Sequence, residues 1–123
     1  MVQDFTHTHR MNDHPGGLAW YCVRTVFRFG REQKSTYEER LTLWFTAGFS
    51  AAISAAEAEA NEYARSFEDC AFAGLTQVYE LSEPPGHGAE VFSLMRDSSL
   101  TTDAYVTAFF DTGNERQDQP PER

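Results

Sequence analysis

The sequence lacks any apolar run of the roughly 18 residues that a membrane-spanning helix needs. Its first residues also lack a basic start followed by an apolar stretch, which argues against a secretory signal. Basic residues are few: 10 Lys and Arg stand against 19 Asp and Glu, and the net charge is −9. A nucleic-acid binder usually needs a basic patch to neutralise phosphates. We therefore predict a cytoplasmic protein with no membrane segment and no nucleic-acid partner.

Cysteine is also scarce, since only Cys22 and Cys70 are present. In a reducing cytosol two cysteines are expected to be free thiols and not a disulfide. His7, His9 and His14 could chelate a transition metal, but no cysteine or carboxylate cluster follows at ligand spacing. No glycine-rich stretch precedes a Lys-Ser or Lys-Thr pair, as a phosphate-binding loop would require. The sequence thus predicts no metal and no cofactor.

Apolar residues, in contrast, are plentiful: they make up 41% of the chain and aromatic residues 14%, which indicates a globular domain. The polar residues 1–17 show no periodicity and predict a flexible N-terminal arm. Residues 114–123 have almost no apolar content and predict a disordered tail. A single folded domain is therefore expected over residues 18–113.

Four segments rich in β-branched and aromatic residues, bounded by polar, Gly or Pro residues, predict strands. These segments are 18–30, 37–47, 72–81 and 88–96. Residues 49–67 carry an apolar stripe at helical spacing that includes Ile53 and Tyr63, with Ser50 as the expected N-cap. Residues 101–113 predict a short final helix capped by Thr101 or Thr102. The predicted fold is α+β, with an antiparallel sheet of about four strands in ββαββα order. One long amphipathic helix crosses one face of this sheet.

Alternation divides the first two strands into two faces. We expect the more apolar sets to lie together under the long helix, namely Tyr21, Val23, Phe27, Leu41, Leu43 and Phe45. The opposite face would then carry Trp20, Arg24, Arg28, Arg40 and Trp44.

Several of these pieces resemble one bacterial family, domain of unknown function 4288 (DUF4288). The resemblance covers about residues 18–113. It rests on the opening Trp-Tyr-x-Val-Arg, on Tyr-Glu-Glu-Arg, on the Ala/Glu-rich helix and on Glu-Val-Phe-Ser. It implies a small standalone bacterial cytoplasmic protein, and it brings no activity, cofactor or catalytic residue.

Two candidate catalytic sites have simpler interpretations. His87, between two glycines, could be a general base, but no nucleophile motif stands beside it, and we predict an exposed bend of a second hairpin. Glu38 and Glu39 are neighbours on a strand and point to opposite faces, so they cannot act together on one substrate. We expect Glu38 to pair across the hairpin with Arg24 or Arg28. No catalytic residue is predicted.

The face with two Trp and three Arg residues is the strongest candidate site, because these residue types are enriched at interface hot spots. It predicts a non-enzymatic protein-interaction module whose partner is either another protein or a second copy in a homodimer. The alternative is a small-molecule or nucleotide-binding protein, or an unrecognised enzyme, that uses the same face or the His87 loop.

Overall fold

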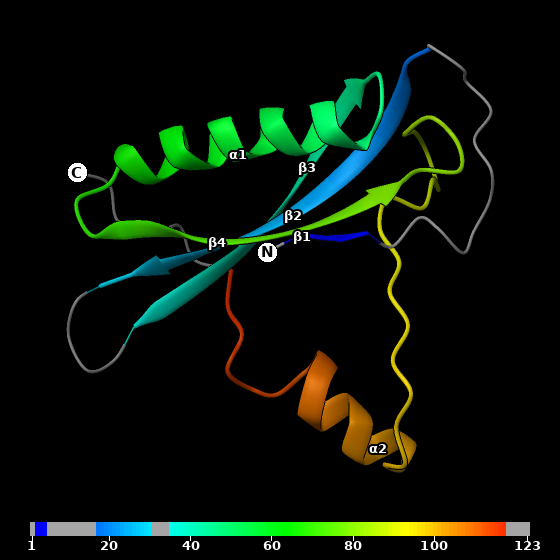
Figure 1. The fold of residues 1–123 in the computed structure, drawn as a ribbon. Helices are drawn as coiled ribbons and strands as arrows, with labels where there is room; N and C mark the ends of the chain where they lie inside the picture. Colours follow the sequence, from blue (N-terminus) through cyan, green and yellow to red (C-terminus); the bar gives the residue numbers. More distant parts are fainter. Residues whose placement is uncertain (1, 5–16, 31–34, 118–123) are drawn as a thin grey trace.

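The computed structural model describes residues 2–4, 17–30 and 35–117, which form a sheet, one long helix and a projecting C-terminal segment (Figure 1). The elements are β1 (Val2–Asp4), β2 (Ala19–Phe29), β3 (Thr36–Thr46), α1 (Phe49–Arg65), β4 (Cys70–Glu80), α2 (Thr102–Tyr105) and the π-helical turn η1 (Val106–Phe110). The sheet order is β1-β4-β2-β3, and α1 crosses one face. The fold is therefore α+β, and the predicted helix after two antiparallel strands is confirmed.

Strands β3, β2 and β4 are antiparallel, whereas β1 pairs in parallel with the middle of β4. The segment predicted as a flexible arm thus includes a short edge strand at Val2–Asp4. The rest of that arm, residues 5–16, and most of the predicted tail, residues 118–123, lie outside the described residues.

The register of the β2–β3 pair decides which side chains meet α1. Tyr21 lies opposite Trp44, and Phe27 lies opposite Glu38. Directly opposite residues of an antiparallel pair project from the same face of a sheet. The apolar set of β2 therefore shares its face with Trp44 and Glu38. The prediction that Leu41, Leu43 and Phe45 lie with this set under the helix is wrong.

The buried residues of α1 are four alanines. Ala52, Ala56, Ala60 and Ala64 recur every fourth residue, which places them on one side of the helix, and all four are buried. Their small side chains let the helix lie close to the large core residues of the sheet. These core residues are Tyr21, Val23, Phe27, Phe29 and Val78.

The other details of α1 differ in part from expectation. The helix begins at Phe49 after Gly48, whose φ of 114° favours glycine, and no side chain caps it, so Ser50 is not the N-cap. Ile53 and Tyr63 pack at the margin of the core and are only half-buried.

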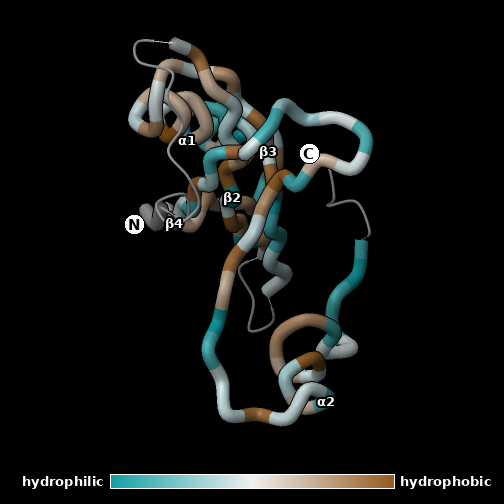
Figure 2. Tube along the Cα trace, turned by 90° about the vertical axis from the view of Figure 1, so that its right-hand side faces the viewer, coloured by the Kyte–Doolittle hydropathy of each residue, from teal (hydrophilic) through white to brown (hydrophobic). Residues whose placement is uncertain are grey.

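The C-terminal third departs most from the predicted order. Residues 88–96 form no strand, so the predicted second hairpin and fourth antiparallel strand are not confirmed. The predicted final helix exists as α2 followed by η1, and Thr101 caps it: its Oγ1 accepts a hydrogen bond from the Ala104 N–H at 3.3 Å. Figures 1 and 2 show these turns well away from the sheet. Among the described elements, α2 and η1 contact only each other.

Candidate functional site

The sheet has a second face, opposite α1, which we call the outer face. Parity along the paired strands assigns to it alternate residues of the three antiparallel strands. They are Trp20, Cys22, Arg24, Val26 and Arg28 of β2, Tyr37, Glu39, Leu41, Leu43 and Phe45 of β3, and Gln77 and Tyr79 of β4.

The β4 side of the outer face is covered by the chain that follows β4. Cys22, Tyr79 and Leu81 form a buried cluster, and Val91 and Phe92 pack against it. The Tyr79 hydroxyl donates a hydrogen bond to Glu90 Oε2 at 2.8 Å, which holds this covering segment in place. The β4 side of the outer face is therefore buried and forms a small core of its own.

The β3 side of the outer face is open. Tyr37, Leu41, Leu43 and Phe45, which we call the β3 strip, are exposed by 60%, 52%, 40% and 49%. Phe45 stacks on Trp20 with ring centroids 4.8 Å apart, so this aromatic pair borders the covered half. Leu41, Leu43 and Phe45 form an exposed apolar row along this edge strand, and the charged Glu39 lies between them and Tyr37.

Arginines flank the β3 strip. The Arg24 guanidinium donates to Glu39 Oε1 at 2.7 Å and lies 5.9 Å from the centroid of the Phe92 ring. The predicted pairing of Glu38 with Arg24 or Arg28 is therefore wrong, since both arginines lie on the outer face and Glu39 is the glutamate there. Arg28 is exposed near the far end of the same strand.

The five residues predicted to share one face are divided between two. Trp20, Arg24 and Arg28 lie on the outer face, whereas Arg40 and Trp44 lie on the face covered by α1. The cause is the register, since a shift of one residue between paired strands moves a whole alternating set to the other face.

Arg40 forms part of the contact between β3 and α1. Its guanidinium carbon lies 3.8 Å from the centroid of the Tyr63 ring, and Nη1 donates to both carboxylate oxygens of Glu59 at 3.3 Å. The Tyr63 hydroxyl donates to Glu38 Oε1 at 2.7 Å. Burial, and then the Glu38 carboxylate, raise the pKa of Tyr63 to about 12. These interactions give the polar side of β3 a structural role.

Trp44 is a margin residue of the core. It packs against the cluster that contains Tyr21 and Val23, and its indole Nε1–H donates to Thr42 Oγ1 at 2.8 Å. Its polar atom is satisfied within the fold, so Trp44 is not available to a partner on the outer face.

The remaining candidates have no site around them. His87 is exposed in the loop after β4, near a turn in which the Ala89 N–H donates to the Gly86 carbonyl. Cys22 and Cys70 are free thiols, as predicted. Burial raises the pKa of Cys22 to about 11, which disfavours the reactive thiolate.

His7, His9 and His14 lie outside the described residues. Within residues 2–4, 17–30 and 35–117, no group of three or more His, Cys, Asp or Glu is placed to hold a metal ion. In this same part of the chain, no helix is long and apolar enough to cross a membrane.

The β3 strip is the feature that sequence reasoning missed. Its members were assigned to the core because they are the more apolar set of their strand. The evidence against that assignment lies in α1, which supplies Glu59 and Tyr63 as partners for the polar set. No signal within β3 itself identifies the exposed set.

Comparison with models of protein families, with curated proteins and with solved structures finds no match to this chain. The resemblance to domain of unknown function 4288 accordingly stays a prediction.

Proposed function

We propose that the protein is a non-catalytic interaction module that binds a protein partner through the open half of its outer face. The observation that carries this proposal is the β3 strip. Its four large apolar side chains are each at least 40% exposed, while Arg40 and Glu38 of the same strand are turned toward α1. An exposed, contiguous apolar patch on a small protein is typical of a binding surface.

The composition of the surface supports a protein partner. Protein interfaces combine an apolar centre with a polar rim, and aromatic residues and arginine are enriched in them. Leu41 and Leu43 would form such a centre, Tyr37 and Phe45 its aromatic ends, and Arg28 part of its rim. The strip lies on an 11-residue strand paired along its whole length with β2, so binding would require little ordering of the backbone.

A small-molecule or nucleotide site on the same face has less support. Stacking of a base needs an accessible aromatic ring near basic groups. Trp20, the indole of this face, already packs on Phe45 and against the buried cluster of Leu81. The exposed ring of Tyr37 has Arg28 opposite it, but Arg24, the other arginine of this face, is paired with Glu39. We further propose a cytoplasmic location and membership of the DUF4288 family, both of which rest on the sequence.

Substitution of Leu41 by Asp tests the proposal, and Ala58→Asp is the matched control. Both changes place a carboxylate at an exposed apolar position, but Ala58 lies on α1, away from the outer face. Tagged wild-type protein would be used to retain binding proteins from cell extract, and these would be identified and purified. Each would then be titrated by calorimetry against wild type, Leu41→Asp and Ala58→Asp. Self-association of the three proteins would be measured in parallel.

We expect Leu41→Asp to raise the dissociation constant by about 30-fold or more, as for a hot-spot residue. Ala58→Asp should leave it unchanged. Equal binding by wild type and Leu41→Asp, or the absence of any binding partner including a second copy, would contradict the proposal. Far-UV circular dichroism of both variants checks that their folds are intact.

A further inference from the structure

The C-terminal segment carries a second unpartnered apolar surface. We call residues 93–110 the arm, which is distinct from the predicted N-terminal arm. It includes α2 and η1, which contact no other described helix or strand. Five large apolar side chains of the arm are exposed, two of them almost fully. They are Met95 (82%), Leu100 (47%), Val106 (38%), Phe109 (48%) and Phe110 (78%).

The arm is an ordered unit. The Arg96 guanidinium donates to the Tyr105 hydroxyl at 2.7 Å and lies 4.4 Å from the centroid of the Phe109 ring. The Tyr105 and Phe109 rings contact each other with centroids 5.0 Å apart, and Thr101 caps α2. These contacts join the extended part of the arm to its helical part, so the arm is preorganised for docking.

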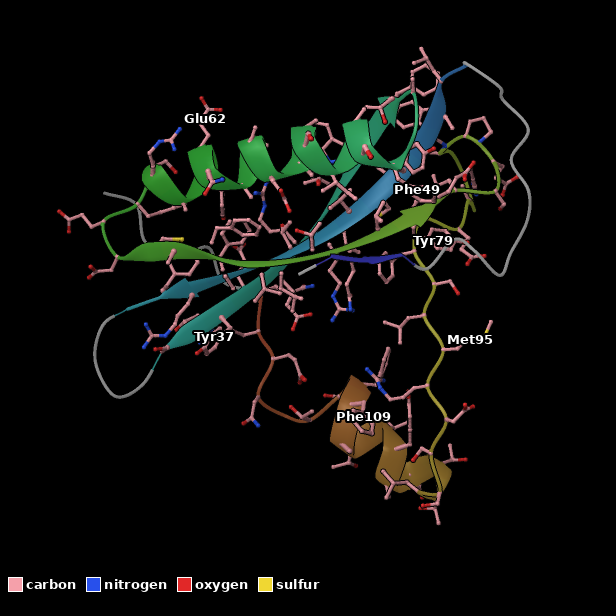
Figure 3. The ribbon with its side chains drawn as sticks, in the orientation of Figure 1. Tyr37, Phe49, Glu62, Tyr79, Met95 and Phe109 are labelled. Atoms are coloured by element: carbon pink, nitrogen blue, oxygen red, sulfur yellow. The ribbon has the colours of Figure 1, made fainter. Side chains whose placement is uncertain are left out.

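The arm projects on the same side of the sheet as the outer face. Figure 1 places α1 on one side of the sheet and α2 on the other, and Figure 2 shows α2 clear of the sheet in a perpendicular view. In Figure 3, Tyr37 of β3 lies on the side of the sheet away from α1, as do Met95 and Phe109 of the arm. The arm thus lies on the same side of the sheet as the β3 strip, and the chain that follows η1 runs back toward the sheet on that side (Figure 1).

We infer that the arm docks on the β3 strip of a second copy of the chain, and that two copies exchange arms reciprocally. This inference rests on the proposed function and names its partner. Both surfaces are apolar, both belong to this chain, and each lacks a cover in the described structure. A two-fold pair in which each arm covers the other copy's strip satisfies both surfaces and forms a closed assembly.

The charges of the two surfaces are complementary. Asp97, Asp103 and Asp111 are exposed on the arm or directly after it, and the one arginine there, Arg96, is engaged within the arm. The strip is bordered by the exposed Arg28, and the charge of Glu39, which lies within the strip, is offset by Arg24 at 2.7 Å. An acidic arm beside the basic Arg28 suits an interface between two copies of a chain whose net charge is −9.

The available area also suits a dimer. Nine large side chains, the four of the strip and the five of the arm, are exposed by 38–82%. If each of these side chains buries an area on the order of 100 Å², one arm–strip contact would bury about 900 Å². A reciprocal pair of contacts would bury about 1,800 Å². Stable, specific interfaces bury roughly 1,200–2,000 Å².

Sedimentation equilibrium of wild type, Leu41→Asp, Phe110→Asp and Ala58→Asp tests the exchange. Leu41→Asp disables the strip and keeps the arm, whereas Phe110→Asp disables the arm and keeps the strip. We expect dimers of wild type and Ala58→Asp, and a dimer dissociation constant raised about 30-fold or more in each of the other two. An equimolar mixture of Leu41→Asp and Phe110→Asp should form heterodimers, because an intact arm then meets an intact strip once per pair.

Each alternative result has a distinct meaning. A wild-type chain that stays monomeric at millimolar concentration overturns the exchange, including the case in which each arm folds back on its own strip. The proposed function would then be decided by the titrations with another protein.

Loss of the dimer in Leu41→Asp but not in Phe110→Asp would leave the strip as an interface and remove the arm as its occupant. Two monomeric variants that do not complement each other also overturn the exchange. If circular dichroism shows that a variant is unfolded, Leu41→Ser or Phe110→Ser replaces it.

Discussion

Replacement of Ala56 by Leu is the most direct test of how α1 lies on the sheet. Ala56 is 1% exposed and packs in the core cluster with Tyr21 and Val23. It stands between Ala52 and Ala60, both fully buried, so the helix has no free space on this side. Three additional carbon atoms at this position must either displace the helix from the sheet or force strained side-chain conformations.

Such overpacking costs typically about 1–3 kcal/mol. The helix propensities of Ala and Leu differ by only a few tenths of a kcal/mol, so propensity cannot account for a loss of that size. Because a domain of this size is stable by roughly 5–15 kcal/mol, the variant should fold but with a clearly lower stability. For roughly 100 ordered residues, the expected decrease in melting temperature is about 4–12 °C.

Ala58→Leu is the matched control, since Ala58 is exposed on the same helix and the chemical change is identical. Thermal unfolding followed by circular dichroism at 222 nm, with urea titration as a second measure, compares both variants with wild type. If Ala56→Leu melted together with Ala58→Leu, the alanine side of α1 could not be the side that contacts the sheet.

Two further predictions concern titratable groups. The pKa of Tyr63 is raised to about 12 from 10 by burial and the Glu38 carboxylate, so the folded state retains this proton longer than the unfolded chain. Its contribution to stability is therefore full below pH 10 and is lost as the pH rises toward 12. Tyr63→Phe should remove this part of the pH dependence in urea titrations, and an unchanged profile would show that Tyr63 is not its source. Burial raises the pKa of both thiols, to about 11 for Cys22, and Cys70 is the less buried. Native iodoacetamide labelling followed by mass spectrometry should modify Cys70 first and Cys22 only after unfolding, and rapid labelling of Cys22 would contradict its burial.

Strand β2 and helix α1 were predictable from sequence, because the spacing of their apolar residues matches the side that each buries in the core. Strand β2 combines β-branched and aromatic residues with a stop at Gly30, and it is central in the sheet. Helix α1 shows its alanines and aromatic residues at helical spacing, and its bounds of Phe49–Arg65 nearly match the predicted 49–67. In both cases the local preference and the tertiary environment agree, which is the condition under which patterns are reliable.

The face of β3 was not predictable in the same way. Alternation separates Leu41 and Leu43 from Arg40 and Thr42, but it does not say which set points toward the helix. That choice depends on the register with β2 and on partners from a distant element. Here Glu59 of α1 supplies the carboxylate that pairs with Arg40. A pattern within one strand contains no information about either.

The segment 88–96 shows a second limit of pattern reading. Its alternation predicted a strand, yet a strand also requires a neighbouring backbone with free N–H and C=O groups. Val91 and Phe92 do bury themselves against Tyr79, so the apolar positions were correctly recognised as contact residues. The Tyr79 and Phe92 rings meet with centroids 5.9 Å apart although residues 88–96 form no strand, and alternation cannot distinguish such packing from pairing in a ladder.

The orientation of β3 has an energetic consequence on each face of the sheet. Complete burial of a leucine stabilises a fold by roughly 1.5–3 kcal/mol, so a lone chain that leaves Leu41 and Leu43 half in water gives up part of this stabilisation. Turning Arg40 toward α1 adds a second cost, because its charge then requires Glu59 and the Tyr63 ring as compensation. A register shifted by one residue would turn Leu41 and Leu43 toward α1 and Arg40 away from it. In the proposed dimer the β3 strip would be covered from outside, and so would the arm, whose Phe110 is 78% exposed. A single contact between the arm of one copy and the strip of another would remove both surfaces from water at once.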